Sequence, residues 1–284
     1  MSGGEAVDLA RQVSLTAQHP NMRKICSQNL LLLGVLLIPL QFLPLITRAE
    51  LPLAQAAANG RAFLTNLLDR QLDLLPEFQG SKTFWLYHDN YLAAKVLGKT
   101  NPEISAKIMA AIRRESAEQD SKAKILFNES EQSLPFRQYQ LTDVRWLTNG
   151  MIRTEITTTN AMDDWTNYAD LLFLACIAET NAASAQADWN AAMILWDGHG
   201  FMDAAARAQK RYATYKLGLA AVAARHLRLE SKLPPNLLKQ LLSLQSTTGG
   251  WITDYDATGE KIGVPNVETT CLCILGIEAR AGVR

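Results

Sequence analysis

The sequence lacks an excess of either charge and contains few cysteines. Of its 284 residues, Lys and Arg together number 28, and Asp and Glu also number 28. This balance is not typical of proteins that neutralise nucleic-acid phosphates, so we expect no nucleic-acid partner. The four cysteines are too few and too irregularly spaced for a disulfide framework. With 48% hydrophobic residues, the composition predicts a globular protein with a sizeable core.

The common signatures of metal and nucleotide sites are also missing. The four histidines are scattered, and the chain has no His-Glu-x-x-His motif and no Cys-x-x-Cys pair. It has no phosphate-binding Gly-x-x-x-x-Gly-Lys-Ser/Thr loop, and no Gly-x-Gly-x-x-Gly or Gly-x-Ser-x-Gly motif. The sequence therefore predicts no metal site and no cofactor, with calcium held by carboxylates alone as the one alternative.

One long uncharged stretch lies near the N-terminus. Residues 25–47 carry no charged side chain, and basic residues flank them on both sides. The stretch is long enough to cross a bilayer, so after a tail at 1–24 it predicts a transmembrane anchor or a signal segment. The protein would then be membrane-anchored with its domain outside the cytoplasm, or secreted. Pro39 supports the alternative, a buried hydrophobic helix broken at that residue in a cytoplasmic protein.

Beyond residue 55 the spacing of apolar residues is that of helices. Apolar residues three and four apart predict a helix over 63–75 that ends at Pro76. Asn101 followed by Pro102 is a typical helix start. Further helices are predicted at 162–178, 188–196, 212–227, 236–244 and 267–279.

One region breaks this helical pattern. From 125 to 158 the sequence is rich in Thr, Val, Ile, Tyr and Trp, which favour strands. Asn149 and Gly150 lie between two extended stretches, and Asn-Gly in that position is a strong signal for a hairpin turn. The region is therefore predicted to be a small β-hairpin insert in a helical protein.

Four segments share a polar and aromatic start that is followed by an apolar continuation. They begin at Trp85, Asp163, Tyr212 and Asn266, and lie about 50 residues apart once the β-rich insert is subtracted. That interval fits a helical hairpin. Helices that are apolar all round are enclosed by other helices, so parallel ones bring their polar starts to one face. The pattern predicts a cleft lined by these starts.

In these segments the sequence resembles the α/α toroid proteins, in particular the six-hairpin glycosidase-like group. The resemblance covers 56–284 and rests on Trp-Leu-Tyr-His-Asp-Asn-Tyr-Leu-Ala from Trp85, Tyr-Ala-Thr-Tyr-Lys-Leu from Tyr212, and Gly-Gly-Trp-Ile-Thr-Asp-Tyr before Asn266. It implies an all-α fold with helical hairpins around a central cleft, as a closed or an incomplete ring. The β-hairpin insert at 125–158 and the N-terminal hydrophobic helix would be additions to it. It also implies a carbohydrate-like ligand in the cleft.

The sequence resembles a second toroid group, the terpene cyclases and protein prenyltransferases, more weakly. Residues 245–251 are similar to the Gln/Trp repeat of the cyclases. However, the acidic Asp-x-Asp-Asp motif of the cyclases and the zinc ligands of the prenyltransferases are absent. A terpenoid or prenyl-group enzyme is therefore the weakest of the hypotheses.

The acids at the segment starts are the candidate catalytic residues. They are Asp89, Asp163, Asp164 and Glu268. Paired carboxylates hydrolyse glycosides when one is a neutral acid and the other is ionised. The same side chains can instead stabilise helix starts, and Asp163 in particular is a favourable capping residue. Asp170 lies about one turn further along the chain and would need a partner if it were buried.

The other polar and aromatic residues of the segments are candidates for ligand binding. Their rings can stack on a sugar, and their hydroxyl, amide and amino groups can form hydrogen bonds with it. They are Trp85, His88, Asn90, Trp165, Asn167, Tyr168, Tyr212, Tyr215, Lys216, Trp251 and Asn266.

Two functions stay open at this point. The first is binding of a carbohydrate-like ligand, with or without cleavage, as a glycoside hydrolase or polysaccharide lyase if the protein is an enzyme. The second is a non-catalytic toroid with an interaction or structural role at the cell envelope. The first function requires the candidate acids to share one pocket, whereas the second does not.

Overall fold

The computed structural model describes residues 53–116, 121–130 and 134–281. These residues belong to the second of two compact units of the chain, Ala49–Arg284. The predicted tail at 1–24 and the predicted membrane or signal segment at 25–47 lie outside the described residues. Within the described ranges, no helix combines the length and the apolar character that a membrane span requires.

Helices make up about 53% of the structure and strands 20%. The helical elements are α1 (Leu53–Leu67), η2 (Leu86–Tyr91), α2 (Leu92–Gly98), α3 (Pro102–Glu115), η3 (Lys122–Phe127), η4 (Trp165–Asn167), α4 (Ala169–Ala178), α5 (Ala182–Ile194), α6 (Ala204–Gln209), α7 (Tyr215–Leu227), η5 (Glu230–Lys232), α8 (Leu237–Ser243) and α9 (Val267–Ala281). The strands are β1 (Thr83–Trp85), β2 (Arg137–Leu147), β3 (Gly150–Ala161), β4 (Tyr212–Ala213), β5 (Ile252–Tyr255) and β6 (Lys261–Pro265).

The expectation of an all-α toroid is wrong, because the strands form two small sheets and make the fold a mixed one. In the first sheet, β3 lies between β1 and β2, parallel to β1 and antiparallel to β2. The predicted hairpin is present, but its turn is at Thr148 and Asn149, because Gly150 already pairs with Leu147 as the first residue of β3. The strands extend to Ala161. Residues 125–127, which were predicted to be extended, belong instead to the 3₁₀ helix η3.

Most of the strand residues that the sequence did not predict belong to the second sheet. In it, β5 lies between β4 and β6 and is antiparallel to both. These strands are only two, four and five residues long, too short for an alternating pattern to be recognised. Because Tyr212 and Ala213 pair with β5, the helix predicted from 212 begins at Tyr215.

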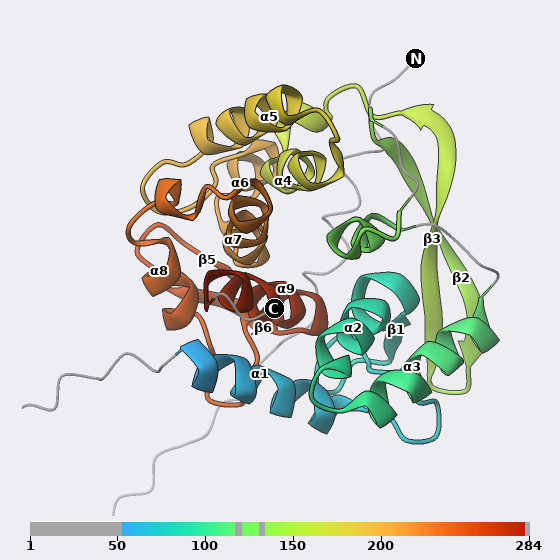
Figure 1. The fold of residues 1–284 in the computed structure, drawn as a ribbon. Coiled ribbons are helices and arrows are strands. Elements are labelled where there is room, and N and C mark those ends of the chain that lie inside the picture. The colour runs from blue at the N-terminus through green and yellow to red at the C-terminus, as the bar shows by residue number, and fades with distance from the viewer. Residues whose placement is uncertain (1–52, 117–120, 131–133, 282–284) are drawn as a thin grey trace, which may run out of the picture. The chain divides into compact units, whose positions relative to one another are not determined.

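Helices α7 and α9 lie at the centre of the helical part (Figure 1). Helix α9 packs against α1, α2 and α7, while α7 also packs against α4 and α8. Nearly every residue of α4 is buried, as expected for a helix enclosed by its neighbours. The core is therefore built around helices whose first backbone N–H groups need hydrogen-bond partners inside the protein.

Local side-chain chemistry set several helix boundaries. The helix predicted at 63–75 ends at Leu67, because the Asp69 carboxylate accepts the backbone N–H groups of the next turn. Helix α4 begins at Ala169 rather than at 162, after the separate turn η4. The predicted start of α3 is confirmed, since Asn101 accepts the Ile104 N–H at 3.3 Å.

Helices α7 and α9 approach each other closely at two glycines. A Cβ atom on Gly218 would lie 2.7 Å from the carbonyl carbon of Leu272. One on Gly276 would lie 2.7 Å from the Cα atom of Gly218. Glycine is therefore required at this crossing because no side chain fits between the two backbones.

We expect Gly218→Ala to lower the free energy of unfolding by about 1–3 kcal/mol, the usual cost of overpacking. The clash should outweigh the roughly 1 kcal/mol that alanine otherwise contributes to a helix. Urea denaturation of the full chain measures the change. Gly98→Ala in α2 is the matched control, because its Cβ would meet only the Ser105 side chain, with the hydroxyl at 3.3 Å and the Cβ at 3.8 Å. Equal stability of the two variants would contradict a tight crossing.

Candidate functional site

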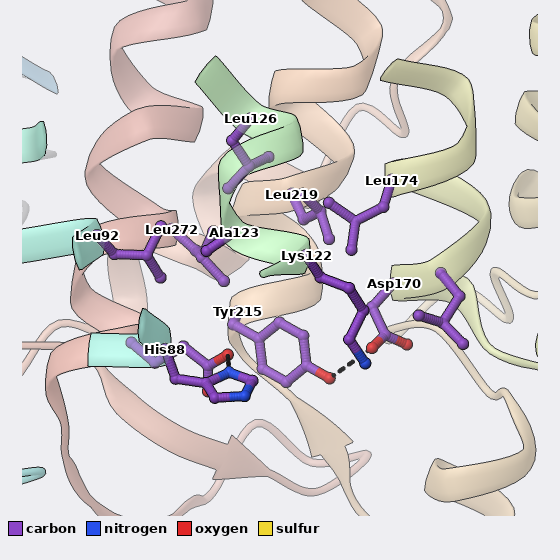
Figure 2. A pocket seen from close by; sticks show the side chains of 12 residues that line it. His88, Leu92, Lys122, Ala123, Leu126, Asp170, Leu174, Tyr215, Leu219 and Leu272 are labelled. Atoms are coloured by element: carbon purple, nitrogen blue, oxygen red, sulfur yellow. Dashed lines mark hydrogen bonds and ion pairs between the residues drawn. The ribbon is translucent and has the colours of Figure 1, made fainter. Parts of the chain in front are cut away.

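A cavity of about 190 Å³ lies where five helical segments begin. Each segment contributes to the lining a polar residue and, four residues later, a leucine. The five pairs are His88 and Leu92, Lys122 and Leu126, Asp170 and Leu174, Tyr215 and Leu219, and Glu268 and Leu272. Figure 2 shows the leucines gathered on one side and His88, Tyr215 and Asp170 on the other. We call the five leucines of these pairs the leucine layer and the five polar residues the polar layer.

The carboxylates of the polar layer lie at helix starts. Asp170 is in the first turn of α4 and Glu268 is in the first turn of α9. Free backbone N–H groups and the helix dipole favour negative charge at these positions. The helix starts therefore supply part of the stabilisation that two carboxylates need in a partly enclosed cavity.

His88 lies between two carboxylates from distant parts of the chain. Its Nε2 is 3.0 Å from Glu155 on β3, and its Nδ1 is 3.5 Å from Glu268 on α9. Burial alone would lower the pKa of His88, but its hydrogen bonds with Glu155 and Glu268, and their charges, raise it to about 10. At neutral pH the imidazole is therefore protonated, so it orients Glu268 and cannot serve as a general base.

Two further acids share the environment of this ion-pair bridge. Burial, followed by the charges of Glu268 and Glu77, raises the pKa of Asp89 well above its usual value. Asp89 is 2% exposed, and its Oδ2 has no hydrogen-bond partner among the described residues. Burial and the charge of Glu268 also raise the pKa of Glu77. The environment therefore shifts both acids toward their neutral form, but neither lines the cavity.

A buried ion pair supports the other half of the polar layer. The Tyr215 hydroxyl donates to Oδ2 of Asp170 at 3.1 Å, and Asp170 Oδ1 lies 3.7 Å from Lys216 Nζ. Lys216, 3% exposed, also pairs with the fully buried Asp203. Asp203 in turn accepts a backbone N–H at the start of α4 and another at the start of α6, each at 3.0 Å. Burial and the charge of Asp170 raise the pKa of Tyr215, which keeps its hydroxyl protonated.

Three of the predicted site residues line the cavity: His88, Tyr215 and Glu268. Asp89, Trp85 and Lys216 lie just outside it and contact or electrostatically influence the lining residues. Asp163 and Asp164, the other predicted acids, are exposed and do not line the cavity.

The remaining predicted residues have other places in the fold. Asn90 is buried and holds backbone groups of Leu75 and Trp85, and Trp251 is buried with its indole N–H donated to Leu241. Asn266 accepts the Thr269 N–H at the start of α9. Four others lie outside the cavity lining, namely Trp165 against Phe136, the exposed Asn167, Tyr168 beside Asp164, and Tyr212 bonded to Asp197.

Asp170, Lys122 and Glu155 were not among the predicted site residues. A sequence signal did exist for the first two, because a polar residue followed four positions later by leucine occurs in all five lining segments. No local pattern marks Glu155, since β1 and β3 pair in parallel and bring it to His88 from far along the chain. The contact between Glu155 and His88 therefore depends on the first sheet.

Comparisons with protein-family models, curated proteins and solved structures found no match. Across the described ranges, no three His, Cys, Asp or Glu side chains are grouped so as to hold a metal ion.

We expect Asp203→Ala to lower the free energy of unfolding by about 3–5 kcal/mol, because it leaves the buried Lys216 without its nearest partner. Chemical denaturation measures the loss. The exposed Asp163→Ala should change stability by less than about 0.5 kcal/mol. Adding Lys216→Met to Asp203→Ala should restore part of the loss, and a double variant less stable than the single one would contradict this explanation.

The His88 bridge predicts a pH dependence. The folded pKa of about 10 lies above the ordinary value of 6.5, so the stability that the bridge contributes is complete below about pH 6.5 and is lost as the pH rises through about 10. NMR titration of the imidazole, assigned through its absence in His88→Gln, measures this pKa directly. Glu155→Gln should lower it, whereas a value near 6.5 in the unaltered protein would rule out the bridge.

Proposed function

We propose that this protein binds a small carbohydrate-like ligand in the cavity between the polar and leucine layers. The observation that carries the proposal is that Asp170, Tyr215 and Glu268, from the starts of three different helices, line one cavity. Their positions are set by neighbouring ion pairs, so little side-chain ordering is left for the moment of binding. The choice of a carbohydrate-like ligand comes from the sequence resemblance to the six-hairpin glycosidase-like group.

The two layers suit the two kinds of surface on a sugar ring. The hydroxyl groups of a sugar can form hydrogen bonds with Asp170 and Glu268. Its C–H face is apolar and can rest against the leucine layer, as ligands do in mostly apolar pockets with a few polar groups. The cavity provides both surfaces within about 190 Å³.

Cleavage of a glycosidic bond is a second candidate, because the cavity holds two carboxylates, Asp170 and Glu268. Cleavage requires one carboxyl group to be a proton donor while the other is ionised. The neighbouring acids whose pKa is raised are Asp89 and Glu77, and neither lines the cavity. Binding without cleavage is therefore the function that we favour.

The proposal can be tested by screening the full-length protein against a glycan array and measuring affinities by calorimetry. Asp170→Asn and Glu268→Gln should each lower the affinity for a bound glycan about tenfold or more, since each removes a charged hydrogen-bond acceptor worth roughly 1.5–3 kcal/mol. Asp163→Asn, at an exposed position outside the cavity, is the matched control and should bind normally.

Chromatography of the bound glycans separates the two candidates. Intact glycans after long incubation favour a binding protein. Shortened products that disappear in Glu268→Gln, with its fold intact, would favour the enzyme. If no glycan binds, the carbohydrate proposal fails, and the alternative of a non-catalytic envelope protein gains support.

A further inference from the structure

Two of the three donor side chains in the polar layer, His88 and Tyr215, already face carboxylates, and the third is Lys122. Both ring nitrogens of His88 face carboxylates, those of Glu155 and Glu268. The Tyr215 hydroxyl donates its single proton to Asp170. Neither side chain therefore has a proton left to offer a ligand.

The unused capacity of the polar layer consists of acceptors. Glu268 faces His88 through Oε1, and within the described part of the chain its Oε2 accepts no hydrogen bond. Oδ2 of Asp170 accepts one hydrogen bond, from Tyr215, although a carboxylate oxygen can accept two. A ligand that meets these atoms has to be a donor.

Positive charge is also in short supply at the cavity. His88 is shared by the carboxylates of Glu155 and Glu268, and Lys216 is shared by Asp203 and Asp170. Each of these cations thus serves two carboxylates. Lys122, which lines the cavity with His88, has its ammonium 4.3 Å from the centre of the Tyr139 ring, and its charge acts on Glu155. Three cations therefore face the four carboxylates of Glu155, Glu268, Asp170 and Asp203.

The same shortage of positive charge affects the pKa values of the neighbouring acids. The charge of Glu268 adds to burial in raising the pKa values of Asp89 and Glu77. A further cation at the cavity would relieve this repulsion, whereas an anionic ligand would increase it.

We infer that the ligand of this cavity carries a protonated amine, which Glu268 and Asp170 bind together, so that the carbohydrate class it takes is an amino sugar. This inference rests on the proposed binding of a carbohydrate-like ligand in the cavity. The ammonium supplies three donors and one positive charge to a layer that has acceptors and too few cations. Sugar acids and sugar phosphates bring the opposite charge, which adds to the repulsion among these carboxylates.

The test is calorimetry of the full-length protein with four probes: glucosamine, glucose, glucuronate and cyclohexylammonium. Glucosamine should bind at least about tenfold more tightly than glucose, and glucuronate should not bind. Glu268→Gln should reduce this preference to about threefold or less, because it removes one of the two charges. The exposed Glu260→Gln is the matched control and should keep the preference. Circular dichroism establishes that both variants are folded.

Each outcome bears on one of the two proposals. Equal affinities for glucose and glucosamine would overturn the amine inference and leave the carbohydrate proposal standing. Binding of cyclohexylammonium but of no sugar would support recognition of an amine and would overturn the carbohydrate proposal. Binding of glucuronate, or of no probe at all, would overturn the amine inference, and the glycan array would then decide the carbohydrate proposal alone.

Discussion

The structure of the cavity depends on one buried carboxylate, Asp203. It pairs with Lys216 and accepts a backbone N–H at the start of α4 and another at the start of α6. Because Lys216 follows Tyr215 and the bonded α4 residue precedes Asp170, this carboxylate places two members of the polar layer at once. A buried helix start needs a partner for its N–H groups, and here that structural need and the shape of the site are met by the same side chain.

The second half of the cavity is organised in a similar way by His88. Its imidazolium joins Glu155 on β3 to Glu268 on α9, and so it connects the first sheet to the central helices. Both halves therefore use one cation between two carboxylates. This arrangement fixes the positions of the polar groups and leaves carboxylate oxygens of Asp170 and Glu268 as acceptors at the cavity.

Local signals predicted much of the helical framework. The Asn101 cap, the hairpin turn that ends at Asn149, and the helices at 236–244 and 267–279 each depend on residues close together in sequence. Helices α8 and α9 lie where the last two were expected. The all-α expectation was wrong because β4, β5 and β6 are too short for a recognisable alternation and exist only through their pairing. Asp163 resembles a cap in sequence, whereas the start of α4 is served by Asp203 from another segment.

By itself, the sequence determined that polar helix starts would be followed by apolar faces, since the spacing of four residues that places Glu268 beside Leu272 is a property of any helix. It also determined that the carboxylate of Glu268 would lie in the first turn of α9. It did not do so for Asp170, because the helix expected from 162 begins at Ala169. Only the tertiary structure decided which of those starts share a cavity and which carboxylates share a cation. The contacts of His88 with Glu155 and Glu268 join residues far apart in the chain, and such pairs are set by how helices and sheet pack rather than by local spacing.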